Sequence, residues 1–185
     1  MQEIEREIIV KAGQGDMRAF REIYQRASGY VYTLAYRVVN KKHDAEEVTQ
    51  DVFLKIHHSL RSFKFEASFK TWLYRIAVNT ALNHAKKRSR VTTREVEEVF
   101  EDPATVTQPD AGKRLEAGET EHQLKLLLDQ LNPDQRACIV LREIEGLDYQ
   151  GIAMSLGINI NTVRSRLKRA RETLMVLGQA QFSPE

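Results

Sequence analysis

The chain has 185 residues, of which 42% are hydrophobic and 29% are charged, and this balance excludes a disordered or fibrous protein. Domains hold roughly 100–200 residues, so the length predicts one domain or two small ones. No apolar run reaches the roughly 18 residues that a membrane span needs, and the acidic start MQEIEREIIV is unlike a secretory signal.

A single cysteine, Cys138, lies in the apolar stretch ACIVL. It has no second cysteine with which to form a disulfide inside the chain. We therefore expect a buried thiol in a reducing compartment, which indicates a cytoplasmic protein.

The formal net charge of +2 conceals an uneven distribution along the chain. Residues 1–90 carry 17 lysines and arginines against 10 aspartates and glutamates, whereas residues 91–134 carry 4 against 11. Residues 135–185 are mildly basic, with 7 against 5. The segments are therefore expected to meet different partners, and the first could face a polyanion. Solvated charged faces would account for part of the same pattern.

Hydrophobic spacing predicts helices almost throughout, and no strand-like alternation persists. Asp44 followed by Glu47 three residues later predicts an N-cap with a capping box. In the first half of the chain we expect one helix from Asp16 through residues 30–40, another from Asp44 to about Leu60, and a third from Ser68 to about Lys87.

Prolines, glycines and a net charge of −4 set residues 91–118 apart as an extended acidic linker. Helical spacing resumes at about Glu119. Asn132-Pro133-Asp134 then begins a helix from Gln135 to Glu145, Asp148 begins a short one to Leu156, and the last runs from about Asn161 to Leu177. The sequence thus predicts an all-α fold of two small helical domains, residues 1–90 and 119–185, joined by the linker.

Residues 149–168, YQGIAMSLGININTVRSRLK, have the pattern of a helix-turn-helix. Ala153 is small enough for two helices to cross closely, and Gly157 suits a turn with positive φ. At 100° per residue, the polar face of the last helix points away from its apolar stripe. Such a face suits phosphates and guanine edges in a major groove, although a solvated cationic face on a plain helical hairpin is the alternative. That face consists of Ser165, Lys168 and Arg169, flanked by Arg164, Arg166 and Arg171.

Residues 63–74, FKFEASFKTWLY, hold five aromatic side chains interleaved with Lys64 and Lys70. Rings that stack on bases, with cations that hold the backbone, are typical of single-stranded nucleic-acid binding. The alternative is that these rings belong to an ordinary core, and we favour this for Phe69 and Trp72. For the loop from Lys64 to Ser68, the two interpretations are about equally favoured. The next helix offers Thr71, Arg75, Asn79 and Lys86 on its outward side and ends in the basic run of residues 86–90.

Leu54 points away from the buried side of its expected helix, among Glu47, Gln50, Asp51 and His58. A single exposed leucine is common in soluble proteins. Because acidic groups surround it on an otherwise basic domain, a basic protein partner is the better interpretation, with a solvated face as the alternative.

Three stretches together resemble the extracytoplasmic-function (ECF, group IV) sigma factors of bacterial RNA polymerase. They are DAEEVTQDVFLKI (44–56), SFKTWLYRIAVNTALNHAKKR (68–88) and LDYQGIAMSLGININTVRSRLKRARETL (147–174). The resemblance implies core polymerase, promoter DNA and an anti-sigma factor as partners. One departure is the turn GININTV, where many members have Pro-x-Gly; Asn159 and Asn161 can each cap a helix there.

The resemblance also implies roles for individual residues. Core polymerase would contact Asp44, Glu47, Asp51 and Leu54. The −10 element would be recognised, and an unpaired base trapped, by Lys64, Phe65, Glu66, Ala67, Ser68, Lys70, Arg75, Asn79 and Lys86. The −35 element would be bound by Thr162, Arg164, Ser165, Arg166, Lys168 and Arg169.

Two other classes of function compete with this interpretation. A helix-turn-helix regulator that works without polymerase would explain the end of the chain but leave residues 44–74 without a role. An enzyme is disfavoured, because the five histidines are scattered and no phosphate-binding loop or nucleophile elbow occurs. We therefore expect no catalytic residues, no metal site and no cofactor.

Overall fold

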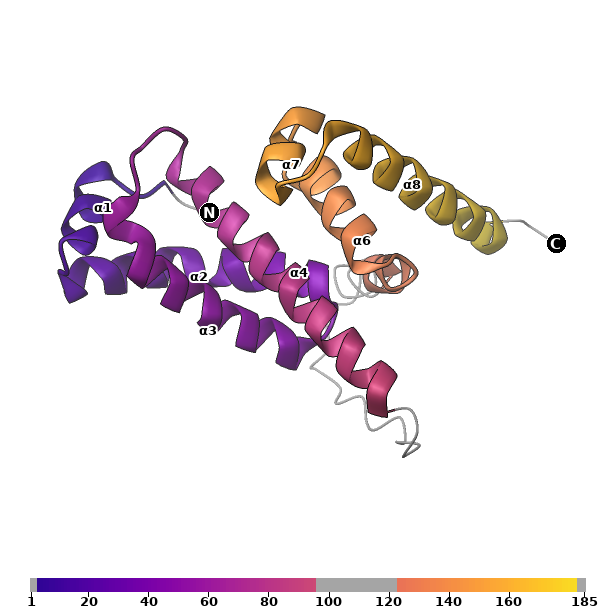
Figure 1. Cartoon of the computed structure of the whole chain (residues 1–185), viewed down its shortest axis with the longest axis horizontal. Coiled ribbons are helices and arrows are strands. Elements are labelled where there is room, and N and C mark those ends of the chain that lie inside the picture. The colour runs from indigo at the N-terminus through magenta and orange to yellow at the C-terminus, as the bar shows by residue number, and fades with distance from the viewer. Residues whose placement is uncertain (1–2, 96–122, 183–185) are drawn as a thin grey trace, which may run out of the picture.

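The computed structural model describes residues 3–95 and 123–182, and these ranges contain helices and no strands, as the sequence predicts (Figure 1). None of the helices in them is both long and apolar enough to cross a membrane. The first domain comprises α1 (Arg6–Gly13), α2 (Met17–Val39), α3 (Lys42–Ser59), the short 3-10 helix η1 (Leu60–Ser62) and α4 (Phe69–Glu95). The second comprises a helix over 123–129, α6 (Pro133–Ile139), the π-helical segment η2 (Val140–Ile144), α7 (Tyr149–Leu156) and α8 (Ile160–Phe182).

The N-terminus of α2 lies where the sequence predicts, and Asp16 caps it. The Asp16 carboxylate accepts hydrogen bonds from the backbone N–H groups of Ala19 (3.2 Å) and Arg18 (2.8 Å). These bonds stabilise the charged form and lower the pKa of Asp16. By contrast, the sequence reasoning missed α1, whose eight residues bury only Ile9 and Ala12.

The predicted start of α3 at Asp44 is wrong. The helix begins two residues earlier, at Lys42, after an N-cap residue, Lys41, whose side chain makes no capping bond. Asp44 lies inside the first turn, where it is buried and forms an ion pair with Arg88 of α4. The carboxylate is therefore used to join two helices instead of capping one.

The core of the first domain lies between α2, α3 and α4. Each helix turns one apolar stripe inward, and side chains such as Ile23, Val48 and Leu73 are fully buried. The inward stripe of α3 includes Ala45, Val48, Val52 and Ile56. α2 runs for 23 residues along this core.

Within the second domain, α6 begins after the Asn132 cap. Its side chain accepts a hydrogen bond from the Gln135 N–H (2.9 Å), and the Gln135 side chain accepts one from the Asn132 N–H (3.2 Å). The helix expected from Gln135 to Glu145 starts earlier, at Pro133, and becomes π-helical from Val140 to Ile144. Gly157 adopts a φ of +63° between α7 and α8, as the turn requires.

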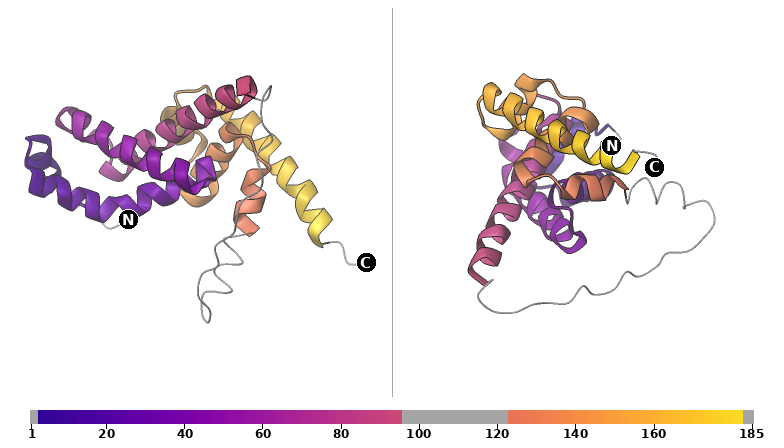
Figure 2. Two further views of the ribbon diagram at one scale, coloured as in Figure 1. Left: turned by 90° about the horizontal axis from the view of Figure 1, so that it is seen from below. Right: turned by 90° about the vertical axis from the view of Figure 1, so that its right-hand side faces the viewer.

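The two domains pack against each other. α4 has α2 and α3 along one side and contacts α6 and α7 of the second domain on another (Figures 1 and 2). One contact between them is made by Arg136 on α6. Its buried guanidinium donates to the carbonyl oxygens of Leu128 (2.8 Å), Leu131 (2.9 Å) and Val38 (3.1 Å). Since Val38 belongs to α2, this one side chain joins the domains.

The acidic linker predicted for residues 91–118 lies almost entirely outside the described residues. Its first five residues, 91–95, are instead the end of α4, which runs beyond the expected end at Lys87. At the other side, α8 extends from Ile160 to Phe182 and so exceeds its predicted bounds at both ends.

Candidate nucleic-acid interface

The outer face of α8 has the orientation expected for a recognition helix. Val163, Leu167 and Ala170 are buried against the rest of the second domain. The side chains on the opposite face, Arg164, Ser165, Lys168 and Arg169, are exposed. The N-terminal end is ordered by Asn159, whose side-chain oxygen accepts from the Asn161 N–H (2.8 Å), and by Asn161, which accepts from Arg164 (2.9 Å). Two asparagine side chains therefore order this turn, at the place where many ECF sigma factors have Pro-x-Gly.

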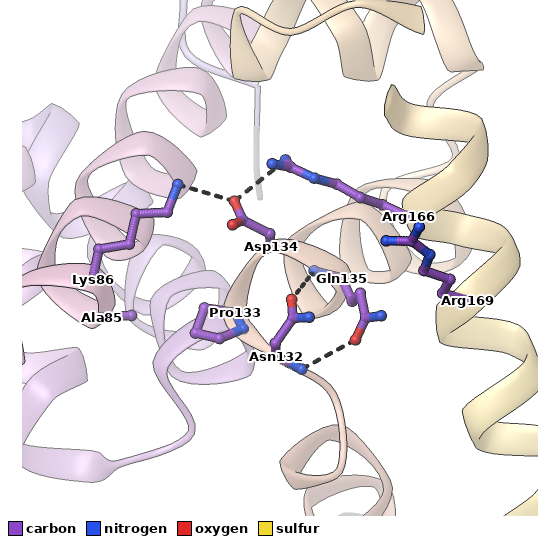
Figure 3. Close-up of a pocket in the computed structure, with 8 residues that line it drawn as sticks. All are labelled: Ala85, Lys86, Asn132, Pro133, Asp134, Gln135, Arg166 and Arg169. Atoms are coloured by element: carbon purple, nitrogen blue, oxygen red, sulfur yellow. Dashed lines mark hydrogen bonds and ion pairs between the residues drawn. The ribbon is translucent and has the colours of Figure 1, made fainter. Parts of the chain in front are cut away.

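Arg166 is placed differently from the other predicted −35 residues. Its side chain is only 23% exposed and lies 3.3 Å from the Asp134 carboxylate of α6. The same carboxylate oxygen is 3.1 Å from Nζ of Lys86 on α4 (Figure 3). Together with Arg169 and Gln135, these residues line a cleft of about 370 Å³ between the domains. Asp134 thus lies within ion-pair distance of two cations, one assigned to each predicted DNA element.

A second cleft, of about 540 Å³, opens on the first domain between α3 and α4. Arg75 and Asn79, predicted from the sequence, lie in it. The sequence reasoning missed Lys55, whose Nζ donates to the Thr80 hydroxyl (2.9 Å) across the two helices. Only the pairing of α3 with α4 brings these groups together, so local spacing gave no signal. The full lining is Lys55, His58, Ser59, Trp72, Arg75, Ile76, Asn79, Thr80 and Asn83.

The aromatic residues beside this cleft form one cluster. The Phe63 ring centroid lies 4.6 Å from that of Phe65 and 5.0 Å from that of Trp72. Phe69 is buried, as the core interpretation predicts, while Trp72 is half-buried and also lines the cleft. The rings therefore hold the loop of residues 63–68 against the domain.

Around that cluster, the loop presents short and charged side chains to solvent. Lys64, Glu66 and Ala67 are exposed. Ser68 is also exposed, and its hydroxyl caps α4 by accepting from the Thr71 N–H (3.0 Å). Phe65 has a φ of +58°, a left-handed conformation that is unusual for a bulky residue. Strained backbone of this kind concentrates at binding sites.

The second domain covers part of this surface. The Asn79 side-chain N–H₂ donates to the backbone carbonyl of Ser155 on α7 (2.7 Å). Lys70 Nζ lies 3.4 Å from the Glu145 carboxylate, whose side chain is 6% exposed and also accepts from Tyr30 Oη (2.7 Å). Burial, this hydrogen bond and the nearby negative charge raise the pKa of Tyr30. In this arrangement, two predicted DNA-contacting side chains are engaged within the chain.

The acidic face of α3 remains open. Asp51 is exposed, and 60% of Leu54 is accessible to solvent. Glu47 is also exposed, and the hydrogen bond from His84 (2.9 Å) lowers the pKa of its carboxyl group. Asp44, however, lies buried beneath this face, so it can support the face but offers little surface of its own.

The single thiol and the possible metal ligands of the described residues can each be assessed from the structure. Cys138 is buried, as predicted, and burial raises the pKa of its thiol to about 11, which keeps it protonated and unreactive. Among the described residues, no group of three or more His, Cys, Asp or Glu side chains could hold a metal ion.

Comparisons with known proteins match both domains. Residues 23–91 match the Sigma-70 region 2 model, and residues 121–174 match the Sigma-70 region 4 model. The RNA polymerase sigma-H factor of Pseudomonas aeruginosa is 35% identical over 179 residues, which cover 94% of this chain and 93% of that protein. The ECF RNA polymerase sigma-E factor of Escherichia coli is 34% identical and shares 90% of each chain. The chain belongs to the ECF sigma factor family.

Solved structures similar to this sigma factor share its fold over nearly the whole chain. CnrH, solved in complex with the cytosolic domain of CnrY, has a TM-score of 0.63 at 26% identity and covers 95% of this chain and 97% of its own. RpoE of Bartonella quintana, solved with the anti-sigma factor NepR, has a TM-score of 0.64 at 26% identity and covers 88% and 98%. The helix α1 of the sigma factor lies outside the region 2 match, which begins at residue 23.

Proposed function

We propose that this sigma factor directs bacterial core RNA polymerase to promoters, with its second domain on the −35 element and its first domain on the −10 element. The observation that carries the proposal is the presence of two separate donor-rich surfaces, one on each domain: the outer face of α8 and the cleft between α3 and α4. The chain itself catalyses no reaction and works in the cytoplasm.

The α8 face is suited to a major groove. Arg164, Lys168 and Arg169 provide charged donors that can bind phosphates or the O6 and N7 acceptors of guanine. Ser165 and Thr162 add short polar groups near the N-terminal end of the helix, where base contacts concentrate in helix-turn-helix proteins. Arg166 would join them once it leaves Asp134.

The first domain is suited to partly opened DNA. Arg75 and Lys55 place cations in the cleft, while Trp72 offers a half-buried ring beside them. A flipped base stacked on an aromatic ring gains about 1–3 kcal/mol, which is comparable to the few kcal/mol needed to unstack it. The exposed loop residues Lys64, Glu66, Ala67 and Ser68 lie beside the cleft and complete this surface.

Core polymerase would bind the acidic face of α3 through Asp51, Glu47 and Leu54, with Asp44 fixing the helix from beneath. Each domain alone makes few phosphate contacts, so the free chain is expected to bind DNA weakly. Holding both domains at the promoter spacing makes the second contact intramolecular and raises the overall affinity. If about six phosphates are contacted, raising the salt concentration from 50 to 200 mM would lower the affinity for DNA about a thousandfold or more.

Regulation by an anti-sigma factor fits the same surfaces. RpoE of Bartonella quintana was solved with such a factor. The exposed Leu54 on the acidic α3 face provides an apolar anchor with charged surroundings, a combination that suits protein recognition. We propose that an anti-sigma factor competes with core polymerase for this face.

The experiment that tests the proposal is in vitro transcription with bacterial core polymerase on a promoter library, with and without this chain. New start sites that require the chain are expected. Absence of such start sites, or footprinting of a palindrome by the free chain, would refute the proposal and favour a polymerase-independent regulator.

Two substitutions then separate the surfaces, and each serves as the control for the other. Arg169→Ala is expected to weaken −35 binding and transcription while leaving core association unchanged in a pull-down. Asp51→Arg is expected to abolish core association while the full chain keeps its residual affinity for −35 duplex DNA. Equal loss of both activities in either variant would contradict the assignment.

A further inference from the structure

The helix α1 makes a direct contact with the loop that we assign to the −10 element. The Arg6 guanidinium carbon lies 4.4 Å from the centroid of the Phe65 ring. A cation over an aromatic face at this distance is attracted by the electron-rich ring. Because α1 precedes the region 2 match at residue 23, the family comparison gives this contact no role.

α1 is firmly attached to the domain and can therefore serve as a fixed support. Ile9 and Ala12 are buried in the core. Glu5, at its N-terminus, accepts from Arg26 of α2 (2.7 Å). At its other end, a Cβ added to Gly13 would lie only 3.3 Å from the Leu60 carbonyl oxygen, so α1 packs closely on η1.

Phe65 is a residue whose conformation has to be held. Its φ of +58° is disfavoured for a side chain of this size. The ring contacts Phe63 (4.6 Å between centroids) as well as the Arg6 guanidinium. A ring held between these two neighbours is an anchor within the domain, and the exposed Lys64 and Glu66 on either side are the residues left to face DNA.

We infer that Arg6 is a positioning residue that holds the −10 loop in its DNA-binding conformation by packing on Phe65. This inference rests on the proposed role of the loop in −10 recognition. Arg6 contacts no DNA itself. It reduces the range of conformations that the loop samples. Lys64 and its neighbours are then in their binding conformation before the unpaired strand arrives, which lowers the entropy cost of binding.

The test measures binding of reconstituted holoenzyme to a fluorescent single-stranded DNA. The probe carries the non-template −10 strand of a promoter selected from the transcription library. Arg6→Ala is expected to weaken binding about two- to fivefold, the range for loss of one exposed cation–π contact. Arg6→Lys, which keeps a cation, is expected to retain most of the affinity. Arg21→Ala, which removes the same charge from an exposed position on α2, is the matched control and is expected to have no effect.

A second measurement distinguishes positioning from general charge or stability. In a Phe65→Leu background the ring is absent, so Arg6→Ala is expected to cause no further loss. Additive losses in the double variant would overturn the inference, as would equal effects of Arg6→Ala and Arg21→Ala. A parallel loss of core binding in Arg6→Ala would overturn it too, because α1 would then be supporting the whole domain.

The loop variant Lys64→Ala separates this inference from the proposed function. If Lys64→Ala weakens probe binding while Arg6→Ala does not, the positioning role fails and the −10 assignment stands. If neither variant changes binding, the assignment of the loop to the −10 element fails, and the inference fails with it.

Discussion

Replacement of Glu145 by alanine is expected to weaken the contact between the two domains. The Glu145 carboxylate lies at the end of η2, is 6% exposed, and accepts a hydrogen bond from Tyr30 Oη across the domain interface. A hydrogen bond to a charged group contributes about 1.5–3 kcal/mol. Its loss would shift the ratio of closed to open chains about 10- to 150-fold toward the open form. The ion pair with Lys70, at 3.4 Å and half-exposed, adds less than about 1 kcal/mol.

Energy transfer between dyes at positions 46 and 172 would measure this shift. Both are exposed glutamates, one on each domain, and they can be replaced by cysteine. The native Cys138 is buried and should not be labelled. The matched control is Glu143→Ala, which removes a carboxylate two residues away that pairs with Arg171 inside the second domain (2.8 Å). If the two variants gave the same distance distribution, the interface would not depend on Glu145 and the reasoning would be refuted.

Three further predictions concern the stability of the second domain and its turn. Arg136→Ala should lower the free energy of unfolding by about 3 kcal/mol or more in urea titrations, because three buried carbonyl oxygens lose their donor; a loss below 1 kcal/mol would contradict this role. Since the native pKa of Cys138 is raised from 9.0 to about 11, stability should fall as pH rises between these values, and Cys138→Ala should flatten that fall. Gly157→Ala should lower the free energy of unfolding by about 1 kcal/mol, measured by thermal unfolding. The φ of +63° disfavours any side chain at this position, even though an added Cβ would meet no atom within 4 Å. An unchanged melting temperature would argue against that conformation.

Features that depend on neighbours in the sequence were predictable. Asn132 and Asp148 each cap a helix as expected, since a capping bond joins groups only two or three residues apart. Asp16 caps α2 at the predicted start of that helix. The exposed face of α8 follows from 100° per residue and the position of its apolar stripe. Cys138 is buried because the apolar residues beside it lie in the core.

Features that depend on distant partners were not predictable. Asp44 has the spacing of an N-cap, but Arg88, 44 residues later, draws its carboxylate into the domain. The contact between Asn79 and Ser155 likewise joins residues 76 positions apart. The cleft between α3 and α4 exists only when the helices pair. The sequence therefore identified many of the candidate side chains but not which of them face one another.

The π-helical segment η2 determines the direction in which the chain leaves the end of α6. Segments of this kind accommodate an extra residue within an α-helical course. Ordinary α-helical winding of residues 140–144, with the chain length unchanged, would instead turn Glu145 by about one residue, or about 100°, around the helix. Glu145 would then point away from Tyr30, and α8 would change its position relative to the first domain. The winding of this one turn therefore orients α7 and α8 relative to the first domain, although none of its own residues is among those assigned to DNA.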